Sequence, residues 1–140
     1  MVTITGTNPD YDLLAPITTD AEVLGRIDQL IGTDARRDRS LWLSFLAADA
    51  VQLPVVVPID DIPICPDPDA AASICHVIAH VLRDAAPGGS AVITLVRDTG
   101  LTATGPDQQW LMALKSAAAR TGILLRMLCV ATREGTRQLD

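Results

Sequence analysis

The chain has 140 residues, of which 49% are hydrophobic and 20% are charged, and its formal net charge is −6. This length and balance predict one globular domain with one core, and they exclude a wholly disordered chain. The negative charge and the few aromatic residues (two Trp, one Tyr and one Phe) argue against a nucleic-acid partner, because phosphates are repelled and base-stacking platforms are scarce.

The first segment, residues 1–18, is expected to form a loose arm, because its opening is polar and rich in turn-forming residues. This opening has neither a basic start nor an apolar stretch, and no apolar run in the chain approaches the roughly 20 residues of a membrane span. We therefore expect a cytoplasmic protein without a membrane partner, whose single α/β domain covers residues 19–140.

A helix is predicted after the arm. Thr19 and Glu22 have the spacing of a capping box, and apolar residues then recur at helical intervals as far as Gly32. These apolar residues are Val23, Leu24, Ile27, Leu30 and Ile31.

The connector that follows, residues 33–39, carries the one basic run of the chain. Its three arginines, Arg36, Arg37 and Arg39, are diluted by two aspartates. We interpret the run as a solvated loop, with a local contact to a phosphate group as the alternative.

From Ser40 the apolar period changes from helical to two, which predicts a strand. A turn at 47–51 and a second strand over 52–58 complete a predicted β-hairpin. Pro54 and Pro58 lie on the same lateral side of the second strand, so we expect it at a sheet edge, blunted against further pairing. The two faces of the first strand carry Leu41, Leu43 and Phe45 on one side, and Trp42, Ser44 and Leu46 on the other.

The remaining elements alternate between helices and strands. The first of these helices has Asp67 or Asp69 as its cap, and the strand after it is almost continuously apolar, as expected at the centre of a sheet. We predict an α/β fold, a three-layer domain with a mixed central sheet, an N-terminal β-hairpin and about three flanking helices. The expected ranges are a helix over 70–85, a strand over 91–96, a helix from Pro106 to Gly122, and strands over 123–131 and 136–139.

Two groups of side chains have the composition of a metal site. His76 and His80 are four residues apart on a helix and could share an ion with Cys65 or Cys75. The aspartates within residues 60–69 could hold a hard cation such as calcium or magnesium. Solvated histidines and an acidic surface loop are the alternatives, and we predict no metal ion at either place.

Several features of residues 40–140 fit one known family. The elements run hairpin, helix, central strand, loop, helix and two strands, Asp107 opens a helix, and Thr104 precedes it by three residues. Gly100 lies in the loop, and residues 117–123 read Ala-Ala-Ala-Arg-Thr-Gly-Ile. In these respects the segment resembles the JAB/MPN metal-hydrolase domain, particularly its RadC-like bacterial branch.

The resemblance implies that the family's zinc-binding histidines fall at Thr94 and Val96, with Asp107 as the third protein ligand. Thr94 and Val96 offer no adequate donor for zinc. The family's catalytic glutamate also has no counterpart, because no glutamate lies between Glu22 and Glu134. The resemblance therefore implies a degenerate domain that binds no cofactor.

Metal-free relatives of such enzymes generally serve as interaction or scaffolding modules, so the resemblance implies a non-catalytic protein-interaction domain. Trp42 and Leu46, on the outer face of their strand, are the expected contact residues, with burial of Trp42 under the N-terminal helix as the alternative. A homodimer is the simplest partner hypothesis.

The competing hypothesis is a small-molecule-binding domain, or a hydrolase, with its pocket in the 97–107 loop at the carboxyl end of the central strand. A solvated pair of Arg97 and Asp98 is the alternative interpretation of that loop. The binding residues expected there are Arg97, Asp98, Thr99, Thr104 and Asp107.

Overall fold

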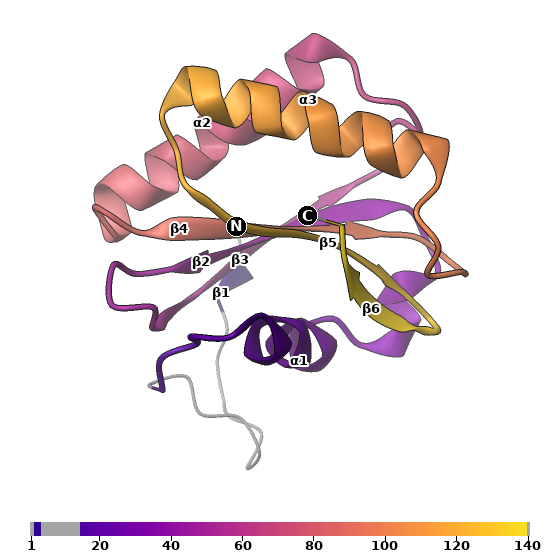
Figure 1. Cartoon of the computed structure of the whole chain (residues 1–140), viewed down its shortest axis with the longest axis horizontal. Coiled ribbons are helices and arrows are strands. Elements are labelled where there is room, and N and C mark those ends of the chain that lie inside the picture. Colours follow the sequence, from indigo (N-terminus) through magenta and orange to yellow (C-terminus); the bar gives the residue numbers. More distant parts are fainter. Residues whose placement is uncertain (1, 4–14, 140) are drawn as a thin grey trace.

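A six-stranded mixed sheet lies between one helix on one face and two helices on the other (Figure 1). The computed structural model describes residues 2–3 and 15–139, and the strand order is β1-β3-β2-β4-β5-β6. The predicted three-layer α/β fold is confirmed. In chain order the elements are β1 (Val2–Thr3), α1 (Asp20–Leu30), the 3₁₀ helix η1 (Thr33–Arg36), β2 (Ser40–Leu46), β3 (Gln52–Asp60), α2 (Pro68–Ala85), β4 (Ser90–Val96), α3 (Gly105–Thr121), β5 (Leu125–Thr132) and β6 (Gly135–Gln138).

The connections explain why α2 and α3 share one face of the sheet. Strand β2 is antiparallel to both β3 and β4, so β3 and β4 run in the same direction, and β5 is parallel to β4. Helix α2 connects β3 to β4, α3 connects β4 to β5, and both crossovers step the same way across the sheet. Because such crossovers are almost always right-handed, both helices lie on one face, and α1 covers the other (Figure 1).

The predicted hairpin is present as β2 and β3, but β3 is not a bare edge strand. Strand β1 pairs with residues 55–56 along the outer side of β3. This short pairing lies between Pro54 and Pro58, where the outer side of β3 still has N–H donors. The expectation that the prolines blunt the edge against all further pairing is therefore wrong.

The helix ends follow the predicted caps. Oγ1 of Thr19 accepts the backbone N–H of Glu22 at 3.1 Å, and Oδ1 of Asp67 accepts the N–H three residues further on at 2.7 Å. Helix α2 begins two residues before its predicted start, because Pro68 fits a first turn that needs no N–H donor. Helix α3 ends at Gly122, whose φ of +77° is left-handed. Within residues 2–3 and 15–139, no helix has the length and apolarity to cross a membrane.

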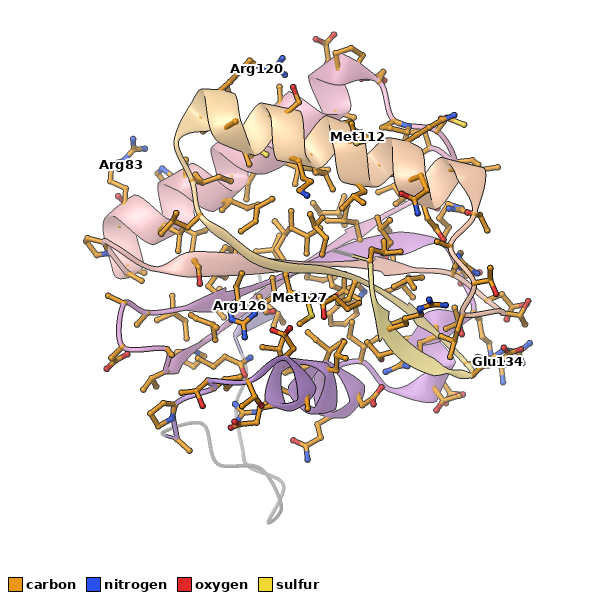
Figure 2. The ribbon with its side chains drawn as sticks, in the orientation of Figure 1. Arg83, Met112, Arg120, Arg126, Met127 and Glu134 are labelled. Atoms are coloured by element: carbon orange, nitrogen blue, oxygen red, sulfur yellow. The ribbon has the colours of Figure 1, made fainter. Side chains whose placement is uncertain are left out.

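The sheet divides the apolar interior into two clusters, where one core was expected. The larger cluster lies between the sheet and α2 with α3, and it includes Leu41 and Phe45. The smaller lies between the sheet and α1, and it includes Met127 (Figure 2), Leu46 and the partly buried Trp42. Leu46 is 3% exposed. Trp42 and Leu46, the two predicted interface residues, therefore pack under α1. For Trp42 this matches the alternative expectation of burial under the N-terminal helix.

The expected N-terminal arm is anchored where the structure describes it. Ile17 is 3% exposed, and its N–H donates to the carbonyl oxygen of Ala50 at 2.9 Å. Pro16 forms an isolated bridge with Val51. These contacts, together with strand β1, contradict a loose arm at residues 2–3 and 15–18, and the rest of the predicted arm lies outside the described residues.

Candidate functional site

Arg97 fills the loop at the carboxyl end of β4, where a ligand pocket was predicted. Its side chain is nearly buried, and its Nε and Nη2 bind the two carboxylate oxygens of Asp107 at 3.3 Å and 2.9 Å. Its other contacts are to the backbone carbonyl oxygens of Thr99, Gly100 and Thr102. The five N–H groups of the guanidinium therefore all have partners in the loop or in α3.

The carboxylate of Asp107 is likewise bonded to groups of the protein itself. It is 1% exposed, and its Oδ2 accepts the N–H of Thr104 at 3.0 Å while Thr104 Oγ1 accepts the N–H of Asp107 at 3.2 Å. These two bonds form the capping box of α3. Asp98 pairs with Arg133 at 2.6 Å, so the solvated pair of Arg97 and Asp98 does not form.

Four of the five predicted binding residues are thus brought together, but as a closed hydrogen-bonded unit, whereas Asp98 pairs with Arg133. The four are Arg97, Thr99, Thr104 and Asp107. An anionic ligand would reach the Arg97 guanidinium only by displacing the Asp107 carboxylate or a loop carbonyl. A buried charge that loses its partner is costly. The network therefore fixes the loop and the start of α3, and it leaves no guanidinium donor for a ligand.

The positions at which the resemblance places zinc ligands do not converge. Alternate residues of β4 face opposite sides of the sheet: Val96 packs in the cluster under α1, and Leu95 in the cluster under α2 and α3. Thr94 shares the α1 side, with its Oγ1 3.2 Å from Cys129 Sγ. Asp107 lies on α3, on the other side. Across residues 2–3 and 15–139, no three His, Cys, Asp or Glu side chains gather where they could hold a metal ion.

The histidine pair is a surface feature of α2. His76 and His80 are exposed, and His80 Nε2 lies 3.1 Å from a carboxylate oxygen of Asp84. Cys75 points the other way, since it is buried and its Sγ bonds a backbone carbonyl oxygen of α3 at 3.8 Å. Cys65 is exposed in the loop before α2. The solvated interpretation therefore holds for both histidines.

The two buried cysteines, Cys75 and Cys129, are core residues. Burial raises the pKa of the Cys129 thiol to about 12, although a hydrogen bond with Thr94 acts in the opposite direction. Burial also raises the pKa of Cys75. Because the thiolate is the nucleophilic form, neither thiol is suited to covalent catalysis at neutral pH.

Sequence reasoning missed the role of Arg36, which was expected in a solvated loop. Its side chain is nearly buried, and its Nε donates to the carbonyl oxygen of Ile31 at 3.0 Å. Its Nη1 donates to the carbonyl oxygens of Thr132 at 3.0 Å and Gly135 at 3.2 Å, and its Nη2 pairs with Asp28 at 3.1 Å. Arg36 thus joins the end of α1 to the turn between β5 and β6.

An open groove of about 510 Å³ lies between the start of α2 and the outer side of α3. Met112, which is 67% exposed, is its most prominent apolar residue, and Asp67 and Arg120 supply its charges. Figure 2 labels Met112 and Arg120 on α3. The rest of the apolar lining comes from Pro66, Pro68, Ala71 and Ala113.

The loop before α2 adds a second exposed apolar residue beside this groove. Nε1 of Trp110 donates to the carbonyl oxygens of Pro63 at 3.2 Å and Ile64 at 3.1 Å, which holds the loop against α3. The Ile64 side chain is nevertheless 59% exposed. Val77 is 39% exposed and lines a neighbouring hollow of about 300 Å³ with Ile62. The outer surface of α2 and α3 is therefore the candidate functional site.

Comparison with known proteins assigns the chain to no family. No family model matches the sequence, and no curated protein matches it.

Proposed function

We propose that this domain is a non-catalytic protein-interaction module whose contact surface is the groove between α2 and α3. The observation that carries the proposal is the apolar groove with Met112 exposed in it. Methionine is flexible and polarizable, and it is common at surfaces that adapt to a protein partner. The resemblance to metal-free JAB/MPN modules is in keeping with this proposal.

Two further observations favour binding over catalysis. The loop at the carboxyl end of β4, a common position for ligands in α/β sheets, has its Arg97 and Asp107 side chains bonded to each other and to the backbone. The buried thiols of Cys75 and Cys129 have raised pKa values and are therefore protonated at neutral pH. The proposed surface differs from the Trp42 and Leu46 face expected from the sequence.

Site-specific photo-crosslinking tests the proposal. Benzoylphenylalanine replaces Met112 in one variant and Leu124 in a matched control, because Leu124 is also exposed, at 62%, but lines a different groove. We expect irradiation in cells to give an adduct of one defined mass at position 112 and none at position 124. Absence of an adduct at position 112, or the same adducts at both positions, would contradict the proposed contact surface.

A further inference from the structure

We infer that the partner of this domain is a basic amphipathic segment of another protein, with an apolar side chain that enters the hollow beside Val77 and positive charges that pair with Asp60 and Asp61. This inference rests on the proposed function and names the chemistry of its partner. It comes from the composition of the hollow of about 300 Å³ at the end of β3, where apolar side chains lie beside negative charges alone.

The apolar wall of this hollow is supplied by three neighbouring elements. Ile59 belongs to the end of β3, Ile62 to the loop that follows, and Ile74 and Val77 to one face of α2. Ile62 and Ile74 are nearly buried, whereas Val77 is half-exposed. Trp110 of α3 also lines the hollow, and its two hydrogen bonds to backbone carbonyl oxygens hold the loop in place. An apolar side chain can therefore pack against a wall that is already formed.

The only charged side chains that line the hollow are the two carboxylates of Asp60 and Asp61, and both residues are exposed. Within residues 2–3 and 15–139, neither carboxylate forms an ion pair. Arg39 lines an adjoining open hollow, but it does so together with three aspartates, Asp38, Asp60 and Asp61. A cation brought by a partner would thus meet carboxylates that are not already paired.

The surrounding sequence has the same sign of charge. No Lys or Arg lies between Arg39 and Arg83, and all the acidic residues of that stretch are aspartates. An acidic surface attracts a basic partner and repels an acidic one. A neutral apolar partner would remove water from the carboxylates without replacing it, which is unfavourable. The aspartates of the stretch are Asp49, Asp60, Asp61, Asp67 and Asp69.

The hollow and the groove of Met112 share their surroundings, which favours a protein segment as the occupant. The loop before α2 lines both, with Ile62 in the hollow and Pro66 in the groove, and both are also lined by α2 and α3. A segment that crosses this loop can contact both places. The hollow alone has a volume at the lower limit of small-molecule pockets.

Selection from a phage-displayed library of random dodecapeptides tests the charge of the partner. The unmodified chain should enrich peptides in which Lys or Arg residues flank a Leu, Ile, Met or Phe. The double variant Asp60→Asn/Asp61→Asn should lose this preference, and asparagine tolerates the left-handed backbone at position 61, where φ is +56°.

The matched control for this selection is Asp34→Asn/Asp49→Asn. It changes the net charge equally at two exposed aspartates that do not line the hollow, so it should keep the preference for basic peptides. Enrichment of neutral or acidic peptides by the unmodified chain, or of no peptide, would overturn the inference.

Fluorescence anisotropy with the most enriched peptide tests the hollow itself. Val77→Lys places a positive charge where the peptide brings its own, and it should raise the dissociation constant by about tenfold or more. Leu124→Lys is the control, because Leu124 is also exposed but lines a different groove, and it should leave the constant within about twofold. Circular dichroism should show the same fold for both variants. Equal binding by both variants would contradict a site at the hollow.

The outcomes separate this inference from the proposed function. If position 112 crosslinks to another protein in cells while the library gives neutral or acidic peptides, the interaction module stands and the basic partner is overturned. If basic peptides bind at the hollow but position 112 gives no adduct, the inferred partner chemistry stands and the groove is not the contact surface. No adduct and no enriched peptide would overturn both.

Discussion

Arg36 and Arg97 are two nearly buried arginines on opposite sides of the same end of the sheet. The backbone N–H of Arg97 donates to the carbonyl oxygen of Ala131, and the side chain of Arg36 donates to that of the next residue, Thr132. Arg97 joins α3, whereas Arg36 joins α1. Both use a forked guanidinium to bind one carboxylate and several carbonyl oxygens.

The two arginines differ in how far along the chain their partners lie. The residues that the Arg97 side chain binds lie 2 to 10 positions away in the sequence. Arg97 therefore holds one loop and the start of one helix. The partners of Arg36 include Thr132, 96 residues away, and Thr136, 100 residues away. The carboxylates also differ: Asp107 is buried, whereas the Asp28 side chain is 52% exposed. The first network is local and buried, and the second connects distant segments at the edge of solvent.

The largest effect is expected from Arg97→Ala. It leaves the buried Asp107 carboxylate without its cation, and we expect the free energy of unfolding to fall by about 3–5 kcal/mol. Urea unfolding measures this loss. Adding Asp107→Asn to this variant should recover about 1 kcal/mol or more, since the amide oxygen still accepts the capping bond and the unpaired charge is gone. A double variant less stable than Arg97→Ala would show that charge burial is not the main cost.

Arg36→Ala should cost less, about 2–3 kcal/mol, because it removes hydrogen bonds to buried carbonyl oxygens but leaves a carboxylate that water can reach. The same unfolding measurement applies. Asp28→Asn is the matched control and should cost less than about 1 kcal/mol, as expected for a half-exposed ion pair. If Asp28→Asn were as damaging as Arg36→Ala, the ion pair would be the main contribution of Arg36.

At alkaline pH, we expect stability to depend more on Cys129, on the α1 side of the sheet, than on Cys75, on the side of α2 and α3. The folded Cys129 thiol has a pKa of about 12, against an ordinary value of 9.0. The unfolded chain therefore loses this proton first, and stability should fall between about pH 9 and pH 12, by about 1.4 kcal/mol per pH unit for each such thiol. Unfolding measured from pH 7 to 10.5 should show this slope. Cys129→Ala should reduce the slope more than Cys75→Ala, and an unchanged slope would exclude Cys129 as its source.

The sequence predicted well the features that depend on neighbouring residues. The caps at Thr19 and Asp67 and the stop at Gly122 are set within one helical turn, so pattern and position were enough. The alternation along β2 also predicted its two faces, because successive side chains of a strand point to opposite sides of the sheet. The sequence named Arg97 and Asp107 as candidates but did not show that they bind each other.

Local periodicity and capping were therefore enough to predict the order of the main helices and strands from α1 onward, most of their limits and the α/β class. Tertiary structure alone decided that Arg36 is buried while its neighbour Arg37 stays exposed. It also decided that Met112 is exposed beside a groove. Whether these side chains are buried or exposed depends on which distant segments pack against them, and the local sequence pattern does not predict those contacts.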